Sequence, residues 1–204
     1  MSMANLVDYR RATSAHDSMK LPAGTLYSYI WAANGTFVYS ENEHFRVLMP
    51  LRWWKMEDER KTVRGLAVLE PYFHLNSPFV SYHILNWILE SSRRVVPDEM
   101  LFFIRRNPGC MWYAAIPVQK FGSTFCQAIE PGDYCPIELH SHNVMPAFFS
   151  NTDNKEETGL RIYAVLGKVT NSVAEIRVRV SVYGHYWTIP YEWVFEPCDE
   201  VKNV

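Results

Sequence analysis

The chain has 204 residues, of which 48% are hydrophobic and 15% aromatic, enough for one large domain or for one domain with a substantial extension. Its formal net charge is −2 and no basic tract exceeds a pair of arginines, so a nucleic-acid partner is not expected. No apolar run approaches the roughly 20 residues of a membrane span, and the four cysteines show no C-x-x-C spacing. We therefore expect a cytoplasmic protein in a reducing setting, without membrane contact.

The N-terminal part divides into a polar start and a β-rich segment. Residues 1–20 are expected to be ordered only in part. Residues 21–75 contain the strand-like runs LYSYIWAA, TFVYSE and HFRVLMPL, separated by turn signals at 34–35 and 41–43. The charged stretch 52–64 is expected to form a loop. We predict a small β-rich segment that packs onto the following domain rather than folding independently.

Residues 76–204 are predicted to form the main domain, which begins with a helix. Ser77 is a suitable hydroxyl cap, and Pro78 follows where no backbone donor is missed. The paired arginines at 93–94 suit a helix C-terminus, and Pro97 ends the helix. Its apolar residues are too numerous for an exposed helix, so we expect it to be largely buried.

Strands follow this helix. The runs at 100–104 and 111–118 are predicted strands joined by a turn, and the turn-rich segment 119–136 leads into a strand at 137–142. A short helix is expected over roughly 151–157, with Ser150 as its N-cap. The segments RIYAVLGKV, EIRVRVSVYG and HYWTIPYEWVFEP then indicate further β-structure. This order of elements indicates an α+β fold.

The segment ELHSHNVMPAFFSNTD contains the pattern H-x-H-x7-S-x2-D. His140 and His142, two positions apart in an extended segment, face the same side, so both imidazoles can reach one metal ion. Asp153 can supply an oxygen ligand, which leaves the fourth tetrahedral position open, as in a catalytic zinc site. The pattern arises by chance on the order of once in two thousand such chains. We therefore expect Zn²⁺ to be bound by His140, His142 and Asp153.

This motif resembles the signature of the JAMM (MPN+ or JAB) metalloproteases, zinc isopeptidases that remove ubiquitin and ubiquitin-like proteins. The family motif adds an upstream glutamate in a segment like P-x-E-x-x-G-L-x-L-G. Here Pro97-Asp98-Glu99 matches its beginning, whereas its glycines are absent. The resemblance implies a mixed β-sheet with flanking helices, of the cytidine-deaminase-like type, and a zinc-dependent peptidase or isopeptidase.

In that chemistry Glu99 is the general base for the attacking water, and Ser150 donates a hydrogen bond to the oxyanion. Each residue has an alternative interpretation. Ser150 could be only a helix cap, and Glu99 an ordinary acid next to a strand. The rival bases are Glu41, Glu43 and Glu70, and Glu138 could orient a ligand instead.

Longer stretches, including AANGTFVYSE, PDEMLFF and the segment from the motif to YEWVFE, resemble the bacterial Prok-JAB branch of the family, of the PRTRC system protein A type. There Asn or His follows the second metal histidine, as Asn143 does here. This resemblance implies that the partner is the C-terminal tail of a ubiquitin-like protein or its conjugate. The resemblance also implies, as further partners, an activating and a conjugating enzyme encoded in the same operon. Some of these operons serve antiviral defence.

The motif leaves two other classes of function open. One is a non-catalytic scaffold of the same family, and the other is a zinc hydrolase of a small-molecule amide. A groove for an extended peptide would favour the protease, and a closed small pocket the small-molecule enzyme. The expected walls of a peptide groove are the segments 119–136 and 143–149, which flank the motif.

Overall fold

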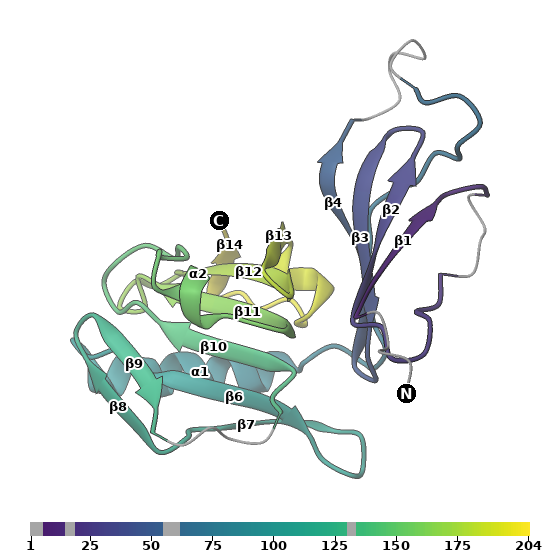
Figure 1. The fold of residues 1–204 in the computed structure, drawn as a ribbon. Helices are drawn as coiled ribbons and strands as arrows, with labels where there is room; N and C mark the ends of the chain where they lie inside the picture. The colour runs from purple at the N-terminus through teal and green to yellow at the C-terminus, as the bar shows by residue number, and fades with distance from the viewer. Residues whose placement is uncertain (1–5, 15–18, 55–61, 130–133) are drawn as a thin grey trace. The chain divides into compact units, whose positions relative to one another are not determined.

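The computed structural model describes residues 6–14, 19–54, 62–129 and 134–204 (Figure 1). By internal contacts the chain divides into two compact units, Met1–Asn76 and Ser77–Val204. Each unit is built around its own β-sheet. The longest helix has 14 residues, and in the described part of the chain no helix combines the length and apolar content needed to cross a bilayer.

The N-terminal unit is a five-stranded sheet in the order β1-β2-β3-β4-β5. The first two strands are parallel and the others antiparallel. The three strand-like runs predicted from the sequence are confirmed, and the segment 1–20 also contributes a strand. The bounds are β1 Val7–Arg11, β2 Tyr27–Ala32, β3 Gly35–Glu41, β4 Phe45–Trp53 and β5 Tyr72–Leu75.

Alternation along these strands fills the core on one face of the sheet. Ile30, Phe37, Tyr39 and Leu48 are almost completely buried there, because every second residue of a strand faces the same side. Most of the predicted loop 52–64 lies outside the described residues, and β4 extends into its beginning.

The C-terminal unit is a mixed seven-stranded sheet in the order β13-β12-β11-β10-β6-β7, with β14 beside β12. The pairs β10–β11 and β12–β14 are parallel and the other pairs antiparallel. A separate hairpin, β8–β9, lies within the predicted connection 119–136, of which residues 130–133 are outside the described part. The bounds are α1 Tyr82–Val95, β6 Leu101–Arg106, β7 Trp112–Ala115, β8 Gln119–Gly122, β9 Phe125–Ala128, β10 Ile137–Ser141, α2 Asp153–Glu156, β11 Leu160–Gly167, β12 Ala174–Val182, β13 His185–Ile189, the 3₁₀ helix η2 Tyr191–Trp193 and β14 Val201–Asn203.

The helix α1 begins later than predicted. Its N-cap is Ser81, whose hydroxyl accepts a hydrogen bond from the His83 backbone nitrogen at 3.4 Å, and not Ser77. The residues before it are extended, because Val80 pairs with Phe195 as an isolated bridge and continues β-structure up to the cap. The predicted burial is found on one side only: Leu85, Ile88 and Leu89 are buried, whereas Trp87 is 46% exposed.

The predicted α+β class, a JAMM-type sheet with flanking helices, is wrong. Strands make up 44% of the structure and helix 11%, and the described residues contain two α-helices, one of them four residues long. The physical reason lies in the second half of the sequence. Runs such as EIRVRVSV alternate with a period of two and are rich in valine, so the chain folds back into neighbouring antiparallel strands instead of crossing over through helices.

The two faces of the C-terminal sheet are covered differently (Figure 1). One face packs against α1, where the Trp87 and Phe102 rings meet edge to face at 5.9 Å. On the opposite face, Leu101 and Phe103 pack against the side chains of β9, and α2 lies farther along the same side. Since His140 pairs with Leu101 in the sheet, it faces this second side.

Candidate metal centre

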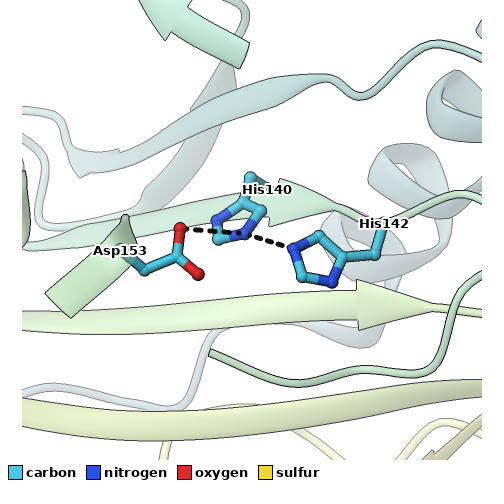
Figure 2. Close-up of side chains that lie close together, drawn as sticks. All are labelled: His140, His142 and Asp153. Atoms are coloured by element: carbon cyan, nitrogen blue, oxygen red, sulfur yellow. Dashed lines mark hydrogen bonds and ion pairs between the residues drawn. The ribbon is translucent and has the colours of Figure 1, made fainter. Parts of the chain in front are cut away.

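The two histidines lie at the C-terminal end of β10. His140 is within the strand, and His142 follows its last residue and continues the pairing, because its backbone nitrogen donates to the Leu166 carbonyl at 2.6 Å. The two imidazoles therefore project from the same face of the sheet, as the i, i+2 spacing predicts. Figure 2 shows them side by side, with Asp153 approaching from α2.

The donor atoms of these three side chains converge. The His140 and His142 Nε2 atoms are 3.1 Å apart, and His140 Nε2 lies 3.7 Å from Asp153 Oδ1. All three donor atoms lie within 4.8 Å of one another. Two nitrogens bound to one tetrahedral zinc at 2.0–2.1 Å would be about 3.3 Å apart, so the spacing of the imidazoles fits a shared ion.

The protonation of the imidazoles also favours a cation. Burial lowers the pKa of His140 to about 4 and lowers that of His142, so both rings are neutral at neutral pH. The His142 Nδ1 atom lies 3.4 Å from the Pro146 carbonyl, and His142 Nε2 lies 3.1 Å from His140 Nε2. A proton on Nδ1 would donate to this carbonyl and leave the Nε2 lone pair for a cation.

Ser150 and Asp153 are bonded to each other in a reciprocal arrangement. The Asp153 backbone nitrogen donates to Ser150 Oγ at 3.1 Å, and the Ser150 backbone nitrogen donates to the Asp153 carboxylate. The helix α2 is shorter than predicted, and its N-cap is Thr152, which makes no side-chain capping bond. Ser150 nevertheless caps the turn in the manner of a capping box, and this fixes the Asp153 carboxylate.

Glu99 lines the same cavity as the three donors. It lies between α1 and β6 and is only 4% exposed, with its backbone nitrogen bonded to the Gly122 carbonyl at 2.8 Å. Burial, and then the nearby charge of Asp153, raise the pKa of Glu99 to about 7. A carboxyl group with a pKa in this range is suited to exchange protons at neutral pH.

The residues that alternate with the histidines connect them to Glu99. The Met100 backbone nitrogen donates to Ser141 Oγ at 3.0 Å, and the Ser141 backbone nitrogen donates to the Met100 carbonyl at 3.0 Å. The Asn143 side-chain amide donates to the Pro97 carbonyl. These bonds lie two residues before Glu99 and directly after it, so they fix its backbone relative to β10.

The cavity around these groups has a volume of about 370 Å³. One wall is the β8–β9 hairpin, and another is the segment that follows His142. The carboxylates that line the cavity favour the binding of cations. The lining residues are Glu99, Leu101, Thr124, Phe125, Cys126, Gln127, Glu138, His140, His142, Met145, Phe148, Ser150, Thr152, Asp153, Glu156 and Glu157.

Other candidates from the sequence have different surroundings. Glu138 accepts a hydrogen bond from Arg161 at 3.0 Å and lines the cavity. Burial raises the pKa of the Cys126 thiol, so it stays protonated and is a poor ligand or nucleophile at neutral pH. The rival bases Glu41, Glu43 and Glu70 belong to the N-terminal unit.

The sequence did not single out Arg179, which contacts the segment that carries Ser150 and Asp153. It donates to Glu157 at 2.7 Å and to Asn154 at 2.6 Å. The alternation in EIRVRVSV indicates only that Arg179 and Arg177 share a face of a strand. Which residues of the rest of the chain face them depends on tertiary packing.

No protein-family model matches this sequence, and no curated protein matches it. The chemistry is therefore inferred from the side chains themselves. Two neutral imidazole nitrogens and one carboxylate oxygen are a donor set that zinc accepts, with one position left for water or substrate. The residues present thus fit the ion that the motif predicts.

Proposed function

We propose that this chain is a zinc-dependent hydrolase of amide or isopeptide bonds that processes or deconjugates a ubiquitin-like protein. The observation that carries the proposal is the convergence of His140, His142 and Asp153 in one cavity with the buried Glu99. The resemblance of the H-x-H-x7-S-x2-D motif to that of the JAMM metalloproteases supports the same chemistry. The three ligands by themselves would be compatible with either a structural or a catalytic ion. A buried base in the same cavity favours a catalytic ion.

Zinc bound by these ligands would supply a Lewis acid and lower the pKa of a water molecule from about 15.7 toward about 7. Glu99 accepts a proton from the attacking water as the oxygen adds to the carbonyl carbon. It then returns the proton to the leaving nitrogen as the C–N bond breaks. The raised pKa of Glu99 supports this role, since the group must both accept and release a proton.

Ser150 has a second role in this proposal. Its Oγ accepts a hydrogen bond from the Asp153 backbone nitrogen, so its hydroxyl hydrogen can be directed into the cavity. There it donates to the oxygen that becomes negatively charged in the tetrahedral intermediate. The cap interpretation and the catalytic interpretation of Ser150 are therefore compatible.

An extended tail is the substrate form that the cavity wall favours. In the described residues β9 pairs only with β8, and the segment 124–127 lines the cavity. Its outer edge can pair with the main chain of an incoming peptide, which fixes register with few demands on side chains. Such a tail suits a ubiquitin-like protein. The small volume, near the lower end for small-ligand pockets, keeps a small-molecule amide as the second candidate.

Metal analysis joined to a cleavage assay tests the proposal. The full chain is expected to bind about one equivalent of zinc, and His140→Ala or His142→Ala to lose most of it. His83→Ala, at an exposed position of α1, is the matched control and is expected to retain the metal. The zinc-loaded chain is expected to cleave a ubiquitin-like protein extended beyond its C-terminal glycines. Full zinc occupancy in the double histidine variant would refute the metal site, and zinc binding without hydrolysis of tails or small amides would favour a scaffold.

A further inference from the structure

The helix α2 carries the third proposed metal ligand, yet none of its own residues is buried. It has four residues, and a helix this short is not stable by itself. Since hydrophobic packing does not fix α2, the position of Asp153 depends on the contacts that neighbouring residues make with the sheet.

Arg179 of β12 makes such contacts on the C-terminal side of Asp153. Its guanidinium forms an ion pair with Glu157 at 2.6 Å, and its Nη1 atom donates to Asn154 Oδ1 at 2.6 Å. The side chains of Arg179 and Glu157 are each only 6% exposed, so solvent screens this pair little. Asn154 directly follows Asp153, and Glu157 directly follows the last residue of α2.

Arg179 also contacts the N-terminal side of the same segment. Its guanidinium lies over the ring of Phe149, 3.8 Å from the centroid, and over the ring of Tyr186 at 4.2 Å. Phe149 directly precedes Ser150. A planar guanidinium can stack on rings and donate in its plane at the same time, which a lysine cannot do.

Tyr186, on the neighbouring strand β13, adds to this arrangement. Its hydroxyl lies 2.9 Å from the Asn154 carbonyl and 2.8 Å from the Glu157 carbonyl. Arg179 and Tyr186 are on the same face of the sheet as His140, because the pairing β10–β11–β12–β13 places them in register with residues of that face. The segment 149–157 is thus attached at both ends to the face that carries the histidines.

We propose that Arg179 is a positioning residue of the metal centre, which holds the segment 149–157 so that Asp153 and Ser150 face His140 and His142. This inference rests on the zinc site of the proposed function. It assigns to Arg179 an effect on metal affinity although Arg179 is not itself a ligand. Residues that orient ligands in this way change metal affinity by about 10- to 100-fold when they are replaced.

The test is the zinc dissociation constant of the full chain, measured by competition with a chelator. Arg179→Lys keeps the charge but loses the stacking and the second donor, and it is expected to weaken zinc binding by about 10- to 100-fold. The visible spectrum of the cobalt-loaded variant is expected to shift toward that of Asp153→Ala, because both lose the carboxylate ligand. A purely structural role of Arg179 would lower stability without moving this spectrum.

Arg161→Lys is the matched control. Arg161 lies on the neighbouring strand β11, pairs with Glu138 at 3.0 Å and lies over the Tyr134 ring at 5.6 Å. In the described residues no hydrogen bond or ion pair joins it to the segment 149–157. Like Arg179 it pairs with a glutamate and lies over a tyrosine ring, although its side chain is 27% exposed, and its replacement is expected to leave zinc affinity unchanged.

Two milder variants keep the test decisive if Arg179→Lys does not fold. Asn154→Ala, at an exposed position, removes only its bond to Arg179, and Tyr186→Phe removes only the hydroxyl contacts. Both are expected to weaken zinc binding. Wild-type affinity and an unchanged cobalt spectrum in Arg179→Lys, or in both milder variants, would overturn the role of Arg179 while the zinc site stands. A wild-type chain that binds no zinc would overturn both proposals.

Discussion

Glu99 is the residue on which the proposed chemistry depends most, and its surroundings differ from those of every rival acid. It is buried beside the proposed ligands, whereas the side chain of Glu43 is 81% exposed and belongs to the N-terminal unit. The hydrogen bonds of the Ser141 and Asn143 side chains fix the backbone on either side of Glu99, so the segment before β6 that carries the carboxylate is held to the end of β10.

Replacing Glu99 by Gln is expected to abolish turnover while zinc and fold are retained, because the amide has nearly the same shape but cannot accept a proton. The loss expected for a removed general base is about 10²- to 10⁴-fold in kcat. Cleavage rates, zinc content and thermal unfolding of the variant check this. Glu43→Gln is the control with unchanged rates, and near-normal turnover in Glu99→Gln would assign the proton transfer to another group.

At the scale of elements, the segment after His142 lies so close to β11 that only glycine fits at one position. A Cβ atom added to Gly167 would lie 2.1 Å from the Ala147 nitrogen and 2.4 Å from the Pro146 carbonyl carbon. The same segment contacts His142 through the Pro146 carbonyl. The end of β11 therefore determines where one wall of the cavity lies.

Gly167→Ala is expected to displace this wall and to lower the free energy of unfolding by at least about 1–3 kcal/mol, as overpacking does. Zinc affinity is expected to fall as well, since the Pro146 carbonyl moves away from His142. Denaturant unfolding and zinc competition measure the two effects. In Gly109→Ala the added Cβ would meet nothing nearer than the Asn107 side-chain oxygen at 3.3 Å, and this control is expected to change little. Equal changes of stability and zinc affinity in both variants would show that the close contact at Gly167 does not position the cavity wall.

The same segment also offers a test of the substrate groove. Met145 lines the cavity and is partly buried, whereas its neighbour Val144 is 61% exposed and outside the lining. Met145→Arg is expected to reduce cleavage of a tail peptide with zinc content and thermal stability retained, because the long charged side chain enters the groove. Val144→Arg is expected to cleave normally. If Met145→Arg also cleaves at the normal rate, the tail binds elsewhere.

For the whole molecule, the C-terminal unit has in its described residues one long helix, α1, which packs on one face of the sheet. Phe102 is fully buried on that face and meets Trp87 of α1 edge to face, so it joins the helix to the central strands. The opposite face is covered by the short helix α2, the β8–β9 hairpin and a loop instead of a second long helix. These elements leave a cavity between them, and this cavity holds the proposed metal centre.

Phe102→Ala is therefore expected to cost about 3–5 kcal/mol in the free energy of unfolding, from lost burial and the cavity left behind. Phe121→Ala, at a position 44% exposed, is expected to cost only about 0.5 kcal/mol. Denaturant unfolding of the two variants gives the comparison. A similar cost at both positions would show that α1 does not anchor the sheet.

The sequence by itself determined the local features of this protein. The i, i+2 spacing places His140 and His142 on one side of a strand, because side chains of an extended chain alternate. Strand-like runs bounded by turn signals likewise determined β2, β3 and β4, and valine-rich alternation determined β12. The helix start was not predicted correctly, because Ser77 and Ser81 are both acceptable caps and only the pairing of Val80 with Phe195 decides between them. The fold class was wrong as well, because the alternating runs of the second half form antiparallel strands instead of crossing over through helices.

The tertiary structure decided which distant residues meet. Antiparallel pairing of β6 with β10 sets Leu101 opposite His140 and so brings Glu99 to the cavity. The register of β10, β11 and β12 places Arg179 on the same face, where it holds the segment of Asp153. The alternation of residues in the sequence indicates which face of its own strand a residue occupies. Its partner across the sheet depends on strand order and register, and these are set by the packing of the whole unit.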